Sequence, residues 1–269
     1  MLISHEVAIR LIAFFGIFAL MALWEILAPK RKLSISKALR WRNNIALTML
    51  NSVILRIAFP AAATGAALYA GAHEWGLLNL LAAPAWISFI CSVILLDLLI
   101  YWQHVMMHRI PLLWRLHRVH HVDLDIDVTT GARFHPIEIL LSMLIKILAI
   151  MLLGAPVLAV LVFEITLNAM AMFNHSNVRL PKAIDSLLRW LIVTPDVHRV
   201  HHSVEVIETN SNYGFNLVCW DRLFGTYRRQ PQAGHQGMAI GLLEWRNPDV
   251  CCRLKGMLSI PFLKTPNNP

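Results

Sequence analysis

Histidine is the residue type whose spacing in this sequence indicates chemistry. Ten of the thirteen histidines fall between residues 104 and 202. They form the groups His104-x-x-x-His108, His117-x-x-His120-His121 and His198-x-x-His201-His202, with His135 and His175 as singles. Residues three and four positions apart share one face of a helix, so each group can direct two or three imidazoles at one centre. The pattern therefore predicts metal binding.

The number and type of these ligands narrow the choice of metal. Imidazole suits iron, copper, nickel and zinc, whereas a structural zinc site takes four ligands and usually some thiolate. The four cysteines form no C-x-x-C pair, and the H-E-x-x-H motif of a zinc hydrolase is absent. Eight to ten imidazoles can fill two metal sites and leave positions open for dioxygen. On ligand type alone, copper stays open beside iron.

Local signals place the three groups on separate helices. Pro111 should break the helix between the first two groups and allow their faces to converge. Thr194 as N-cap and Pro195 at the first helical position predict a helix that carries the third group. His135 and His175 flank an apolar hairpin on the histidine side, and we expect both to be ligands.

Carboxylates near the predicted ligands are candidates for orienting them. A metal-bound histidine usually donates its second ring N–H to a carboxylate or carbonyl. Glu138 and Asp196 stand beside predicted ligands and are expected to accept such bonds. Three further acidic residues are expected to lie in a solvated loop: Asp123, Asp125 and Asp127.

Composition indicates a membrane protein. Hydrophobic residues make up 57% of the 269 residues, only 15% are charged, and the mean hydropathy is +0.56. Soluble domains are about 45–50% apolar and about 25% charged. The net charge of +8 is therefore interpreted as contact with lipid headgroups and basic loops, and not as nucleic-acid binding. The cysteine pattern favours a reducing compartment without disulfides.

Apolar runs predict an all-α bundle of about four to five membrane spans with a cytosolic, histidine-rich helical cap. A bilayer core needs roughly 20 apolar residues per helix. Spans are expected near residues 9–28, 50–70 and 84–102, followed by a helical hairpin over 137–173 that turns at 154–156. Asp97 and Glu164 lie inside apolar segments, and each is expected to sit near an interface or to pair with a neighbour.

The Lys/Arg excess gives the orientation. Residues 29–46 form a basic loop, which should face the cytoplasm and leave the N-terminus outside. The later spans then deliver every histidine group, and the C-terminus, to the cytoplasmic side. A bacterial cytoplasmic membrane is the expected location, and the first apolar run is interpreted as a retained span.

The segments around the histidines resemble one superfamily. The sequence reads Tyr101-Trp-Gln-His-Val-Met-Met-His108, then Leu116-His-Arg-Val-His-His121, and later Thr194-Pro-Asp-Val-His-Arg-Val-His-His202. This order and spacing resemble the fatty acid hydroxylase/sterol desaturase superfamily, and nearby segments look like its bacterial branch. The resemblance covers about residues 90–230. We expect an N-terminal region with two spans (1–83), a catalytic domain (84–230) and a C-terminal cytosolic tail (231–269).

The resemblance implies a membrane-bound di-iron oxygenase. It would hold two iron ions, use O₂ as co-substrate, and hydroxylate or desaturate a C–H bond of a sterol, fatty acyl chain, ether lipid or similar lipid. Some members carry a further H-x-x-x-H group before the last cluster. Here only His175 occupies that region, with Ala171 four positions back. The aromatic residues of the 220–227 segment are expected to pack the cap against the membrane face.

Electrons must come from another protein. The sequence has no C-x-x-C-H, no iron–sulfur cysteine set and no G-x-G-x-x-G. A ferredoxin or a cytochrome b5-like protein is the expected donor. Two other functions stay open: a desaturase, which shares the first hydrogen abstraction, and a membrane metal-binding or transport protein. The latter would place its ligands along the spans, whereas these histidines lie at span ends and in loops.

Overall fold

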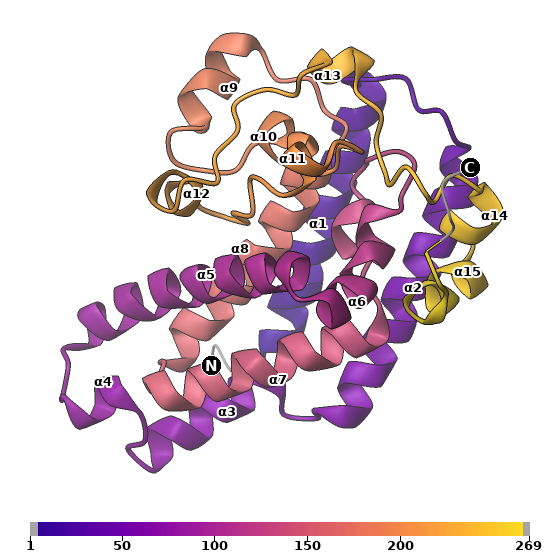
Figure 1. Cartoon of the computed structure of the whole chain (residues 1–269). Coiled ribbons are helices and arrows are strands. Elements are labelled where there is room, and N and C mark those ends of the chain that lie inside the picture. The colour runs from indigo at the N-terminus through magenta and orange to yellow at the C-terminus, as the bar shows by residue number, and fades with distance from the viewer. Residues whose placement is uncertain (1–4, 266–269) are drawn as a thin grey trace.

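The computed structural model describes residues 5–265, and within that range the chain is helical, with isolated bridges and no strand. Five helical segments are long and apolar enough to cross a membrane. They are α1 (Glu6–Leu27), the α2–α4 segment (Lys37–Leu80), α5 (Ala85–Arg109), α7 (Pro136–Leu153) and α8 (Val157–His175). The shorter helices gather at one end of this bundle as a cap (Figure 1). The predicted fold class is confirmed.

The second span differs from its prediction at both ends. Helix α2 (Lys37–Ala58) begins inside the expected basic loop, where the Ser36 hydroxyl accepts a hydrogen bond from the Leu39 N–H and caps it. The helix ends before Pro60, which disfavours helical backbone at the preceding residue, and α3 (Ala62–Ala72) follows. The predicted span over 50–70 is therefore broken in two.

The hairpin turn lies where it was predicted. Helix α7 ends at Gly154, which has a φ of 70° and closes the helix in the left-handed conformation. Pro156 then precedes the first residue of α8. The loop between α3 and α4 (Leu77–Leu80) packs on this turn so closely that a Cβ on Gly76 would overlap the Gly154 backbone.

Charged residues inside the bundle are paired. The Lys146 ammonium lies 2.6 Å from the Glu164 carboxylate, and the Arg10 guanidinium lies 2.8 Å from it, which joins α7, α8 and α1. The Asp97 carboxylate on α5 accepts a hydrogen bond of 2.8 Å from the Trp220 indole. The expectation that these two acids pair with neighbours is confirmed, since an unpaired charge at this depth is costly.

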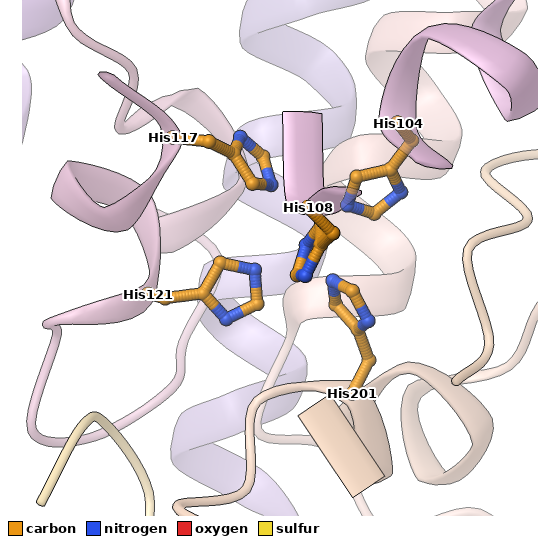
Figure 2. A group of neighbouring side chains, drawn as sticks. All are labelled: His104, His108, His117, His121 and His201. Carbon is orange, nitrogen blue, oxygen red and sulfur yellow. The ribbon is translucent and has the colours of Figure 1, made fainter. Parts of the chain in front are cut away.

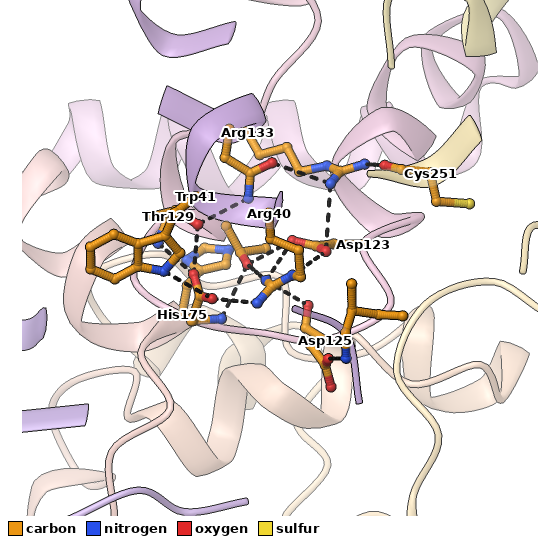
Figure 3. A network of polar contacts seen from close by, with 12 residues as sticks. Arg40, Trp41, Asp123, Asp125, Thr129, Arg133, His175 and Cys251 are labelled. Carbon is orange, nitrogen blue, oxygen red and sulfur yellow. Dashed lines mark hydrogen bonds and ion pairs between the residues drawn. The ribbon is translucent and has the colours of Figure 1, made fainter. Parts of the chain in front are cut away.

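A buried ion network joins the cap to α2. The Arg40 guanidinium donates to the carboxylates of Asp123 and Asp127, and all three side chains are fully buried (Figure 3). The expectation of a solvated loop for Asp123, Asp125 and Asp127 is therefore wrong. These aspartates alternate with buried Leu124, Ile126 and Val128. Both faces of the segment are thus covered, and the acids are satisfied by cationic or N–H partners supplied from distant sequence.

Candidate metal centre

Four helices carry the clustered histidines. Helix α5 has His104 and His108 in its last two turns, and α6 (Pro111–His121) follows after one extended residue, Ile110. Pro111 is the first residue of α6, as predicted. Helix α8 ends at His175. Helix α10 (Pro195–His201) begins at Pro195 behind the Thr194 cap, whose hydroxyl accepts from the Val197 N–H.

These helices bring nine of the ten predicted ligands into two groups. Group I contains His104, His108, His117, His121 and His201, and group II contains His120, His175, His198 and His202. Within each group, one ring nitrogen per residue lies within 4.8 Å of every other. The group I rings point toward one another (Figure 2). The two groups adjoin, because the rings of His121 and His202 stack at 4.6 Å between centroids.

The groups do not follow the sequence motifs. In the second motif, His117 and His121 belong to group I and His120 to group II. In the third motif, His201 belongs to group I whereas His198 and His202 belong to group II. Successive residues of a helix are about 100° apart, so positions i and i+4 point nearly alike while i+3 diverges from i+4. Each H-x-x-H-H motif thus contributes to both groups, whereas His104 and His108 of the first motif both belong to group I.

His135 lies outside both groups. Its Nδ1 accepts a hydrogen bond from the Ile137 N–H and caps α7. Its ring faces Phe262, 5.9 Å away between centroids. His175, the other single histidine, is a member of group II. The structure therefore brings together one of the two singles and leaves the other as a helix cap.

Fixed acceptors set the tautomer of five of the nine rings. The Nδ1–H of His104 donates to the Tyr213 carbonyl at 2.8 Å, and that of His201 donates to the Ser211 carbonyl at 2.7 Å. The remaining three pairs join His120 to the Arg133 carbonyl, His175 to the Ala171 carbonyl and His117 to the Glu138 carboxylate. A donating Nδ1 leaves Nε2 as the free electron pair, which is the arrangement of metal-binding histidines.

Only one of the two predicted carboxylates orients a ligand. Glu138 accepts from His117 Nδ1 at 2.6 Å, as expected. Asp196 instead binds the Lys30 ammonium and the Arg199 guanidinium, each at 2.5 Å, and lies 3.6 Å from His235 Nε2. Its position in the first turn of α10 explains this, because the side chain points away from the grouped rings and toward these basic partners.

The free nitrogens fit a metal. Among the described residues, Nε2 of His104, His117 and His201 is buried without a hydrogen-bond partner. Both nitrogens of His108, His121 and His202 are buried and unpartnered too. In group II, His175 Nε2 lies 2.9 Å from His198 Nε2 and 3.0 Å from His120 Nε2. So many buried acceptors without donors are costly in any other setting.

Burial favours the neutral, metal-binding form of His120, His121, His201 and His202. Burial, followed by the neighbouring imidazoles, lowers the pKa of His120, His121 and His202 well below the ordinary value. Burial lowers the pKa of His201 to about 3. Neutral imidazole is the form that binds metals, so no proton has to be displaced at neutral pH.

Sequence reasoning missed the groups that hold the ligands from behind. Most are backbone carbonyls, which carry no side-chain signal. One weak signal was Gly131, in the short helix η2 (Thr130–Ala132): a Cβ there would overlap the Ala171 carbonyl and stand 3.3 Å from His175 Nδ1. That glycine permits the close approach of η2 to the His175 ring.

Comparison with known proteins agrees with this geometry. Residues 89–226 match the fatty acid hydroxylase family. The chain is 30% identical to the ornithine lipid hydroxylase OlsE of Rhizobium tropici, over 85% of this chain and 70% of that protein. It is 29% identical to the alkylglycerol monooxygenase of Xenopus tropicalis over 69% of this chain and 41% of that protein, and 29% identical to the human enzyme over 48% and 28%.

No solved structure matches the chain. The family match covers the segment that carries all nine grouped histidines, from His104 to His202. The five apolar helical segments make the protein an integral membrane protein. The chain belongs to the fatty acid hydroxylase family.

Proposed function

We propose that this protein is a membrane-bound di-iron oxygenase that hydroxylates a C–H bond of a lipid. The observation that carries the proposal is the pair of adjoining histidine groups at the end of the membrane helices. Group I has five histidines and group II has four. Nitrogen-only ligation by neutral imidazoles suits iron. The family match and the names of the relatives, a lipid hydroxylase and a monooxygenase, support the same reaction class.

Bound iron would activate dioxygen. The protein would position the metal ligands and the substrate and would exclude water. Groups I and II would each hold one ion. The backbone carbonyls behind the rings and Glu138 would keep the Nε2 atoms aimed inward. Phe215, whose ring centroid lies 6.0–6.1 Å from those of His104, His175 and His198, would form an apolar wall beside both groups.

The reaction needs a separate source of electrons. Hydroxylation consumes a C–H bond, one O₂, two electrons and two protons, and gives an alcohol and water. A ferredoxin or a cytochrome b5-like protein would deliver the electrons. The basic flank of the first span supports a cytoplasmic location for the cap, where such donors are reduced. The relatives are named for an ornithine lipid and for alkylglycerol, and we propose a lipid with a polar headgroup as the substrate.

The test combines metal analysis with product analysis. Purified protein, loaded anaerobically with ferrous iron, should bind about two ions per chain, and the His201→Ala/His202→Ala variant, which removes one imidazole from each group, should bind them more weakly. With a reconstituted donor, ¹⁸O₂ and ornithine or alkylglycerol lipids, we expect products that carry one ¹⁸O. Products that are lighter than the substrate by two hydrogens would show that the reaction is desaturation and not hydroxylation. Failure to bind metal near stoichiometry after iron loading would overturn the oxygenase.

A further inference from the structure

Two short helices of the cap present a large apolar surface. Helix α9 (Lys182–Leu188) and the turn after it carry Leu187, Trp190 and Leu191, and α12 (Cys219–Leu223) ends at Leu223. These four side chains are between 66% and 72% exposed. We name them the α9–α12 face. The two helices are tied together, because the Arg222 guanidinium donates to the Arg189 carbonyl and Ile192 bridges to Leu217.

Helix α9 buries its one carboxylate and exposes large apolar side chains. Asp185 is buried and accepts hydrogen bonds from the Thr194 hydroxyl and the Arg189 guanidinium. Ile184 and Leu187 point outward, beside the exposed Lys182 and Ser186. A helix at a protein–water boundary shows the opposite arrangement, with the apolar stripe facing the core. The polarity of α9 therefore matches an apolar surrounding.

Helix α12 is anchored to α5, one of the helices long and apolar enough to cross a membrane. Trp220 of α12 donates its indole N–H to Asp97 of α5 at 2.8 Å, and the Leu217 N–H donates to the same carboxylate at 3.3 Å. Asp97 lies seven residues before His104 in α5, which is about 10 Å along the helix axis. Helix α12 is thus held beside α5 at a point that precedes the histidines along that helix.

The face continues the lipid-facing surface of α5. The Phe224 ring packs on Trp102 with centroids 4.8 Å apart, and Trp102 is itself exposed. The Arg222 guanidinium lies over the Trp190 ring at 4.6 Å and over the Tyr227 ring at 4.7 Å. Aromatic rings with an arginine folded over them are typical of the boundary between acyl chains and headgroups.

From these observations we infer that the α9–α12 face is immersed in the bilayer and is covered by lipid acyl chains. The cap then does not merely stand above the membrane: one edge of it enters the leaflet. The loop between α11 (Val206–Thr209) and α12 connects this edge to the metal centre, because the Tyr213 carbonyl in that loop holds His104. The inference extends the predicted contact between the 220–227 aromatics and the membrane face, and it does not depend on the proposed reaction.

The test measures the depth of one side chain without turnover. The accessible cysteines are removed (Cys91→Ser, Cys219→Ser), while Cys251 and Cys252 are fully buried and stay. Leu191→Cys is labelled with a fluorophore in phosphatidylcholine liposomes, and quenching by doxyl lipids is compared with quenching by aqueous iodide. Two matched positions calibrate the scale: Leu148→Cys on α7 for the bilayer and Ala233→Cys on the cap for water.

We expect position 191 to be quenched by doxyl lipids as position 148 is, and to be protected from iodide severalfold relative to position 233. Leu223→Cys repeats the measurement from α12 should the first variant fail to fold. Iodide quenching as strong as at position 233, without doxyl quenching, would overturn the inference. The face would then await a soluble partner or a second copy. Because no iron or donor is needed, the result is separable from that of the oxygenase test.

Discussion

Histidines of one motif belong to different groups, and this division can be tested by counting the metal ions that matched variants bind. His120 and His198 come from different motifs but from the same group, whereas His121 and His198 come from different motifs and different groups. The variant His120→Ala/His198→Ala leaves five histidines in group I and two in group II. The variant His121→Ala/His198→Ala leaves four and three. Protein sites that hold a metal firmly supply at least three ligands.

We therefore expect the first variant to retain about one metal per chain and the second to retain about two with weaker affinity. The assay loads ferrous iron, or Co²⁺ as a redox-inert probe, under anaerobic conditions and counts metal after gel filtration. The two variants are matched, since each removes two imidazoles and one from each H-x-x-H-H motif. Equal metal content in both would refute the grouping and restore the simpler rule of one centre for each motif.

Four further predictions follow from the surroundings of the two groups. Glu138→Ala should lower the affinity of group I for metal by about 10–100-fold, with exposed Glu205→Gln as a control that leaves it unchanged; chelator competition measures both, and equal affinities would contradict the role of the carboxylate. His135→Ala should keep full metal content, because the ring caps a helix outside both groups. Loss of one ion on metal analysis would show that His135 is a metal ligand after all. Gly131→Ala should displace the Ala171 carbonyl and cost about 1–3 kcal/mol of stability, together with metal from group II, measured by thermal unfolding and metal counting; an unchanged melting temperature would mean that the backbone yields. Arg40→Met should leave buried Asp127 without its cation and buried Asp123 with only the Arg133 guanidinium at 3.5 Å, and should lower the free energy of unfolding by about 3–5 kcal/mol, whereas exposed Arg246→Met should have little effect on denaturation.

Features governed by local chemistry could be predicted from the sequence. The Gly154–Pro156 turn, the helix break at Pro111 and the Thr194 cap each depend on a backbone preference that a few residues carry. The apolar runs gave the bundle for the same reason, since a span needs only length and hydropathy. The second span was the exception. The apolar run predicted one continuous helix, although Pro60 within it ends α2.

Features decided by contacts between distant segments could not be predicted. Asp123 and Asp127 look like loop acids until Arg40, more than eighty residues earlier, neutralises them in the core. Asp196 stands two residues from His198, yet the helix directs it away from the ring toward Lys30. Proximity along the chain was a poor guide in both cases, because the partner that satisfies a buried charge is chosen by packing.

The residue four positions before His175 serves group II through its backbone. Some members of the superfamily carry an H-x-x-x-H group in this region, and in this chain Ala171 occupies the earlier position. In the folded chain the carbonyl of Ala171 accepts the Nδ1–H of His175 at 2.7 Å and so orients it. Gly131 of η2 packs against the same carbonyl, and a Cβ on Gly131 would overlap it. Group II reaches four imidazoles because α6 and α10 contribute to both groups. The sharing of each H-x-x-H-H motif between the groups is thus what allows two groups of four and five imidazoles to form from three motifs and one single histidine.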